Sequence, residues 1–395
     1  CEKEGNHGQL SESVEFYEPR GFRTDYRKRD AQDGERIATA SVSQPSLHPA
    51  HQGEIDDSSF IGLSIEKWHD PVEVIKINDR RGNKYEIVEV PEAQGNAKWN
   101  WVCQDEELYP PAVWDDLKTR YGLPLQSDTK KIALGEIRVT DVAALTLKGV
   151  HISAETNGIT TGFRCPAGYA AIRSFGELVR LASIKELSLQ PDELEIGLQA
   201  TTIAESGFLT HRIFIADSLD NGAGYAPQIA KPEILKQILH YINNDLRIRY
   251  DEVSHQACTS ACNRCIQSWE NRFYGDLNWR LGLDVAALAI GEALPTHRWF
   301  ERTELFAKQL KSSWLQDRGE LVQCVSGEDI WAIVNESRTS AVLLGHPLWL
   351  QDHDFINDTQ DAAIGFLEDD LGINERNIAF SDLYELSISP SEILT

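Results

Sequence analysis

Hydrophobic and polar residues follow a regular period only from about residue 60 onward. Between residues 30 and 59, Ser, Gln, Pro, His and Asp dominate and large apolar side chains are few, so residues 1–59 are expected to be a loose N-terminal segment or linker. Two β-rich runs between Val72 and Val90 flank the polar turn Asn-Asp-Arg-Arg-Gly-Asn, which predicts a hairpin. More strands are expected over 131–154, which makes 60–150 a β-rich subdomain.

The middle of the chain changes to helical spacing. Between Ala167 and Leu187, apolar side chains recur every three or four positions, which predicts a helix with one buried face. The patterns that follow predict strands at 193–203 and 210–216 and helices at 229–242 and 281–293. These elements are assigned to one domain, 151–295.

In the last hundred residues, segments with helical spacing alternate with segments typical of strands, which predicts a small α/β unit over 296–395. The expected helices are 303–315, 328–335 and 362–371, and the expected strands are 321–325, 341–344 and 378–380. The fold class is therefore predicted as α/β: a mixed α+β central domain, preceded by a β-rich segment and followed by this α/β unit.

Composition limits the class of protein. No apolar stretch approaches the roughly 20 residues that cross a bilayer, and the first residues do not resemble a secretory signal. Seven unevenly placed cysteines do not suggest a disulfide framework, so a cytoplasmic location without membrane partners is expected. The formal net charge is −24, which opposes broad non-specific contact with nucleic acid.

Half of that charge lies in residues 318–395, where 15 Asp and Glu face only 3 Arg. A solvated acidic surface is the simplest interpretation. A surface for a basic partner, or one that mimics nucleic acid, is the alternative.

A compact cysteine cluster is the strongest chemical signal. Cys258, Cys262 and Cys265 lie within eight residues, and His255 precedes them by three. Zinc prefers a tetrahedral set of Cys and His ligands, so these residues predict a structural Zn²⁺ site with His255 as the nearest fourth ligand. Cys103 and Cys165 remain alternatives through folding. A third thiol beside Cys262-x-x-Cys265 favours metal over a redox role.

A second motif joins the strand residues 213–216 to Asp217, followed by Asn221, Gly222 and Gly224. The glycines are expected to supply positive φ or close packing, and Asp217 a local cap. Alternatively, Asp217 and neighbouring acids could hold magnesium in a metal-dependent nuclease acting on DNA. The chain has no phosphate-binding Gly-x-x-x-x-Gly-Lys loop and no Asp-Glu-Ala-His, His-x-Lys, Gly-x-Ser-x-Gly or His-Glu-x-x-His motif, so we assign no catalytic residues.

The order of these motifs resembles the zinc-binding C-terminal domain of MrfA-like superfamily 2 DEAD/DEAH-box helicases. The same domain occurs in the bacterial antiphage systems DISARM (subunit DrmB) and Druantia (helicase DruE). The resemblance rests on Asp217, Asn221, Gly222, Gly224 and Tyr225, on Cys258, Cys262 and Cys265, and on the stretches 135–141, 174–180, 266–271 and 277–284. The family typically has four cysteines, so the fourth ligand stays open here.

The resemblance implies a helicase-associated region whose zinc is structural and which helps to position nucleic acid or partner subunits. The expected partners are helicase motor domains in cis or a helicase subunit in trans, with DNA reached through that complex. The chain itself has no motor motifs, so it would be the C-terminal part of an ATP-dependent DNA helicase or a subunit that joins one. The resemblance also implies a role in antiviral defence.

Overall fold

A computed structural model describes the well-placed parts of the chain. They are residues 16–17, 45–47, 53–78, 85–89, 101–103, 119, 129–148, 166–202, 209–272, 274–300, 302, 319–325, 329–349, 353 and 356–388. The chain divides into two compact units, one of residues 1–50 with 73–139 and one of residues 51–72 with 140–395.

The first unit is built on a six-stranded sheet. Its order is β2 (Pro45–Leu47), β5 (Val72–Asn78), β8 (Thr129–Thr140), β6 (Tyr85–Glu89) and β7 (Trp101–Cys103), with β1 (Phe16–Tyr17) paired to β8. The strands predicted between 72 and 90 are present as β5 and β6, but the predicted hairpin is wrong because β8 lies between them. A long strand offers backbone donors and acceptors on both edges, so both strands pair with β8 instead of each other.

The second unit contains a five-stranded antiparallel sheet that carries the functional elements. Its order is β10 (Leu194–Thr202), β11 (Leu209–Asp217), β9 (Val142–Leu147), β4 (Leu63–Lys67) and β3 (Glu54–Asp56). The strands predicted at 193–203 and 210–216 are confirmed here as β10 and β11. Those predicted within 131–154 are confirmed as β9 in this sheet and β8 in the six-stranded sheet.

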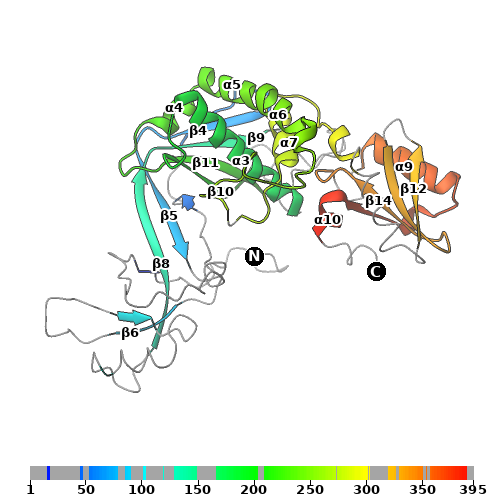
Figure 1. Cartoon of the computed structure of the whole chain (residues 1–395), viewed down its shortest axis with the longest axis horizontal. Coiled ribbons are helices and arrows are strands. Elements are labelled where there is room, and N and C mark those ends of the chain that lie inside the picture. Colours follow the sequence, from blue (N-terminus) through cyan, green and yellow to red (C-terminus); the bar gives the residue numbers. More distant parts are fainter. Residues whose placement is uncertain are drawn as a thin grey trace. The chain divides into compact units, whose positions relative to one another are not determined.

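Helices pack on this sheet and on one another (Figure 1). Helix α3 (Pro166–Leu187) contacts β10 and β11 and also packs against α7 (Trp279–Ala289). The two helices approach closely because Gly282 has no side chain: a Cβ there would lie 3.0 Å from the Ser174 Cβ. The helices predicted at 167–187 and 281–293 are thus confirmed, with slightly different ends.

The helix predicted at 229–242 is longer and irregular. After the short α4 (Tyr225–Ile229), α5 (Pro232–Tyr241) continues through a π-helical turn (Ile242–Leu246) into α6 (Arg247–Asp251). Asn243 in the π turn donates from Nδ2 to the carbonyls of Leu239 and Ala286, at 3.0 and 3.1 Å. These bonds tie the turn to α7, since Ala286 belongs to that helix.

The C-terminal part of the second unit forms a four-stranded sheet with helices α9 (Asp358–Asp369) and α10 (Leu383–Ile388). Its order is β12 (Gly319–Val325), β13 (Asp329–Asn335), β14 (Ala341–Gly345) and β15 (Ile378–Asp382), with only β14 and β15 parallel.

The helix predicted at 328–335 is wrong, because residues 329–335 form strand β13. Ile330, Ile333 and Val334 are β-branched and buried, and β12 and β14 pair with this strand on both sides. The predicted helix at 303–315 lies outside the described residues. The strands predicted at 321–325, 341–344 and 378–380 and the helix predicted at 362–371 are confirmed.

Mixed helices and largely antiparallel sheets confirm the predicted α/β class. Within the described parts of the chain, no helix combines the length and the apolar character that crossing a membrane requires.

Candidate metal centre

The cysteine loop, residues 255–267, starts at the last residue of a 3₁₀ turn (Val253–His255) that follows α6. Backbone hydrogen bonds make it compact: the Cys258 N–H donates to the His255 carbonyl at 2.9 Å. The N–H groups of Cys265 and Gln267 both donate to the Cys262 carbonyl, at 3.0 and 3.2 Å. These tight turns bring residues with short sequence spacing to one point.

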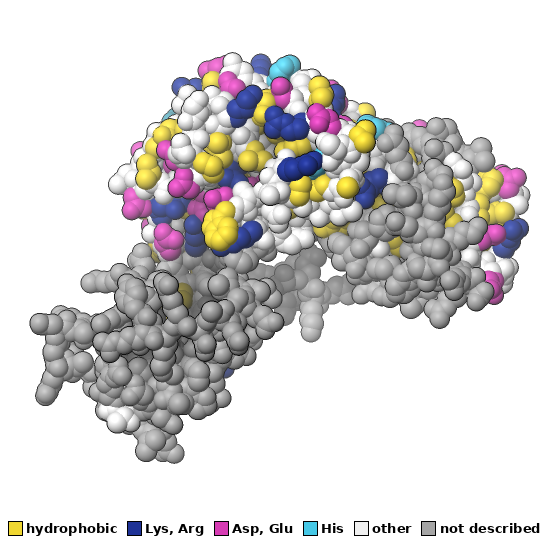
Figure 2. All heavy atoms as spheres, viewed as in Figure 1, with side chains coloured by type: hydrophobic (Ala, Val, Ile, Leu, Met, Phe, Trp, Pro, Cys, Tyr) yellow, Lys and Arg dark blue, Asp and Glu magenta, His cyan; other side chains and the backbone are white. Residues whose placement is uncertain are grey.

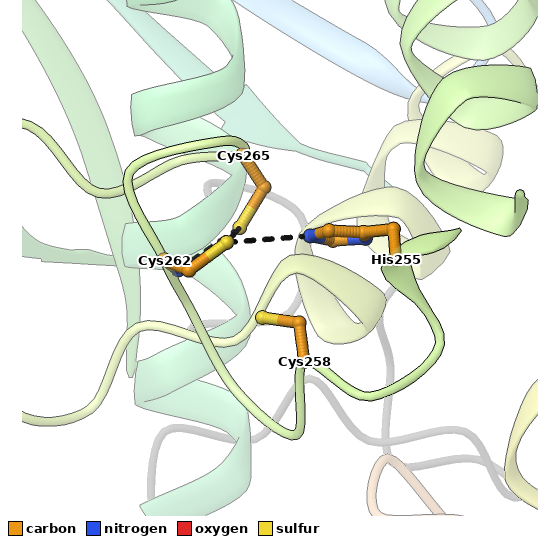
Figure 3. A group of neighbouring side chains, drawn as sticks. All are labelled: His255, Cys258, Cys262 and Cys265. Atoms are coloured by element: carbon orange, nitrogen blue, oxygen red, sulfur yellow. Dashed lines mark hydrogen bonds between the residues drawn. The ribbon is translucent and has the colours of Figure 1, made fainter. Parts of the chain in front are cut away.

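Four potential ligand atoms converge in this loop (Figure 3). They come from His255, Cys258, Cys262 and Cys265, and all lie within 4.8 Å of one another. The Sγ atoms of Cys262 and Cys265 are 3.7 Å apart, and the Cys262 Sγ is 3.5 Å from the His255 Nε2. A tetrahedral Zn²⁺ with Zn–S bonds of about 2.3 Å separates its sulfur ligands by about 3.8 Å. The spacing and the Cys₃His donor set therefore suit zinc.

The histidine is oriented by its other ring nitrogen. His255 is buried, and its Nδ1 lies 3.1 Å from the Tyr250 carbonyl, to which it donates when Nδ1 carries the proton. That arrangement leaves Nε2 as the free lone pair facing the thiols, a common support for histidine ligands. The rings of Tyr250 and Trp279 pack against the imidazole, with centroids 5.3 and 5.1 Å away.

The three thiols have different electrostatic environments. Burial raises the pKa of Cys258 and raises the pKa of Cys265 to about 12. Burial also opposes the Cys262 thiolate, but hydrogen bonds from the Arg264 backbone and from His255 outweigh it and lower that pKa to about 7. Three thiolates this close together need a cation, and zinc binding would displace their protons.

The start of α7 holds the cysteine loop in place. The Cys258 carbonyl accepts hydrogen bonds from the Trp279 Nε1 at 3.2 Å and from the Arg280 Nη1 at 2.8 Å. The Trp279 N–H donates to the Ser260 carbonyl at 3.0 Å. Asn278 caps α7 by accepting from the N–H groups of Arg280 and Leu281. Trp279 and Arg280 lie within the stretch that resembles the helicase family, but the sequence did not show that they support a ligand.

The second motif forms a closed turn, the Asp217 turn (residues 217–226). Asp217 is fully buried, and its carboxylate accepts from the N–H groups of Ala223, Tyr225 and Ala226 at 2.6, 3.0 and 2.8 Å. Asp217 therefore acts as a local cap, the structural role considered from the sequence. With these bonds, its carboxylate is engaged by backbone groups rather than presented to a substrate.

Glycine is required within this turn. Gly222 has a φ of 75°, and a Cβ there would lie 2.0 Å from the Asp141 Oδ2. The same oxygen accepts from the Gly224 N–H at 3.0 Å. The Asp141 side chain thus fills the space that a side chain at position 222 would need, and it accepts a hydrogen bond from the backbone of the turn.

Segments that resemble the helicase family also contact one another in space. The Ser174 Oγ accepts from the Asn278 N–H at 2.8 Å, and the Arg180 Nη2 donates to the Ser268 Oγ at 2.9 Å. The Thr140 Oγ1 donates to the Asp217 carbonyl at 2.9 Å. The motifs form one connected framework around α3, the Asp217 turn and the cysteine loop.

Of the fourth-ligand candidates, the structure brings His255 to the three thiols. Cys103 lies in β7 of the other unit, and Cys165 lies outside the described residues.

Comparisons with known proteins add little. No protein-family model matches the chain, and no curated protein matches it. Among solved structures, the chain is similar to the crystal structure of the DUF1998 helicase MrfA bound to DNA, with 13% sequence identity and a TM-score of 0.32. The likeness covers 60% of this chain but only 24% of that helicase, and it is too weak to assign a shared function.

Proposed function

We propose that this chain is a helicase-associated zinc-binding region, either the C-terminal part of a superfamily 2 DNA helicase or a partner subunit of one. The convergence of His255, Cys258, Cys262 and Cys265 carries the proposal, because it supplies the zinc ligands that the motif order leads one to expect. The contacts between the resembling segments support it further.

In this proposal zinc is structural. Four protein ligands complete a tetrahedral set and leave no open position for a substrate or a catalytic water. The ion would order the cysteine loop and thereby the first turn of α7, through the bonds to the Cys258 carbonyl. The region would then position DNA or a partner subunit beside a motor, in a cytoplasmic antiphage system of the DISARM or Druantia kind.

Metal content tests the zinc site. The purified chain should contain about one zinc per chain, and Cys262→Ser should lose it, because removing one of four ligands cripples a structural site. Cys324→Ser is the matched control: Cys324 is also a free cysteine, buried in β12 and outside the cluster. Full zinc in Cys262→Ser, or equal loss in both variants, would contradict the assignment.

ATP hydrolysis tests the helicase association. The complete product of the native gene, measured with and without DNA, should show DNA-stimulated turnover if the motor is in cis. If the product has no turnover, the chain should co-purify with a helicase subunit that does. If neither result is obtained, the proposed helicase association is wrong, but the proposed zinc site is unaffected.

A further inference from the structure

A cleft of about 450 Å³ lies beside the cysteine loop and is rich in cations. Its lining combines residues from the end of α6, the cysteine loop, the start of α7 and the segment that follows α7. It includes Arg280, Arg298, Arg302 and His297, together with Asp251 and Gln256. Three arginines in one small cleft contrast with the chain's formal net charge of −24.

The acidic groups at this cleft are already engaged by one arginine. Arg298 donates from Nε and Nη2 to both carboxylate oxygens of Asp251, at 3.0 and 3.2 Å. Its Nη1 lies 3.3 Å from the buried Asp284 Oδ1. Arg298 is thus neutralised inside the protein and acts as part of the cleft wall.

The other two arginines form no ion pair with an acid among the described residues, although Asp251 and Asp284 lie near enough to Arg280 to influence its pKa. Arg280 donates to backbone carbonyls and to the Gln256 side chain, all neutral acceptors. Among the described residues, Arg302 has no hydrogen-bond or ion-pair partner. Burial, followed by the nearby charge of Arg302, lowers the pKa of Arg280 to about 10. Two partly desolvated guanidinium groups therefore repel each other at this cleft, and an anion between them would be stabilised.

A phosphate group matches this arrangement best. Planar guanidinium groups donate paired hydrogen bonds to phosphate oxygens, and they do so more strongly where water is partly excluded. The cleft is small, so it suits one phosphate held locally rather than a long charged track. Lys and Arg side chains also gather over the region of α5, α6 and α7 on the face shown in Figure 2.

We propose that this cleft binds a phosphate of a DNA strand, with Arg302 and Arg280 as its contacts. The assignment to DNA rests on the proposed helicase association, whereas the phosphate chemistry rests on the cleft alone. Because Arg280 also bonds the Cys258 carbonyl, the metal-bound cysteine loop would fix the position of one of the two contacts.

Fluorescence anisotropy of a labelled single-stranded oligonucleotide tests the proposal, with the 395-residue chain and Arg302→Gln. Loss of one phosphate contact should weaken binding about 10-fold and reduce the salt dependence by about one ion. Arg302→Lys, which keeps the charge, should retain part of the affinity. Arg376→Gln is the matched control, because it removes an exposed arginine in the C-terminal unit and should bind like the parent chain.

Several outcomes would overturn the proposal. Equal affinity of Arg302→Gln and the parent chain would do so. Protection from heat by inorganic phosphate, without oligonucleotide binding, would assign the cleft to free phosphate instead. Zinc loss in Arg302→Gln, with unchanged DNA affinity, would mean that Arg302 serves to balance the metal–thiolate charge, since Cys258 lies near enough to influence its pKa. Zinc content measured on the same samples separates these results from failure of the proposed zinc site.

Discussion

The Asp217 turn and the cysteine loop are both short polar segments at the ends of regular elements, yet they are stabilised in different ways. The Asp217 carboxylate satisfies three backbone N–H groups by itself. In the cysteine loop, three thiols and an imidazole nitrogen all face one another, and thiols are weak hydrogen-bond partners. One turn is complete with protein atoms, whereas the other presents four donor atoms that a cation would complete. The difference shows how one framework can hold an intrinsic cap beside a loop whose side chains suit a metal ion.

Zinc removal should produce the largest difference between the cysteine loop and the Asp217 turn. A chelator should open the cysteine loop, because structural zinc contributes apparent binding free energies of about 10–16 kcal/mol in small zinc domains. The Asp217 turn should stay closed. Hydrogen exchange measured by mass spectrometry should therefore rise in 255–267 and remain slow in 217–226. Equal exchange in both segments after chelation would show that they unfold as one element.

Asp217→Ala should produce the opposite pattern. It leaves three backbone N–H groups without their acceptor, one of them on the buried Ala226, and we expect a loss on the order of 3 kcal/mol in the free energy of unfolding. Zinc content should stay near that of the parent chain. Urea unfolding and metal analysis measure the two quantities. Asp217→Asn keeps one side-chain oxygen and should fall between the parent and the alanine variant.

Paired glycine variants sharpen the role of the turn's backbone. Both Gly222 and Gly224 have positive φ, so alanine at either should cost about 1–2 kcal/mol. Only a Cβ at Gly222 would collide with Asp141, while nothing lies within 4 Å of one at Gly224. Gly222→Ala should therefore be more destabilising by a further 1 kcal/mol or so. Thermal unfolding of both variants would reveal whether the clash or the φ angle dominates.

The smallest effect is expected from the helix caps. Asn278→Ala removes the cap of α7, and Asn357→Ala removes the cap of α9, so each should cost about 1 kcal/mol. Only the α7 cap lies beside residues that bond the Cys258 carbonyl. Competition with a zinc indicator should therefore detect faster metal release from Asn278→Ala and no change from Asn357→Ala. Equal release rates would show that the cap and the loop are independent.

Local patterns predicted the helices over α3 and α7, the strands of the central sheet and the clustering of the three thiols, since each depends on nearby residues. The predicted hairpin was wrong because β8, which is distant in sequence, pairs with both strands. The predicted helix over 328–335 was wrong because pairing with the neighbouring strands β12 and β14 makes these residues a strand. His255 could be proposed from proximity alone, but the bond from its Nδ1 to the Tyr250 carbonyl required the folded chain. The contacts of Arg280 with the cysteine loop join residues 22 positions apart and leave no periodic trace in the sequence.

The π turn between α5 and α6 behaves as one extra residue in an otherwise continuous helix. Deleting Asn244 would convert this turn into regular α-helix and would disturb the bonds from the Asn243 Nδ2 to the carbonyls of Leu239 and Ala286. The segment that carries the Tyr250 carbonyl and His255 would then lose this attachment to α7, although every cysteine spacing in the motif would be intact. This irregular helical turn, upstream of His255, therefore contributes to the position of the candidate metal centre.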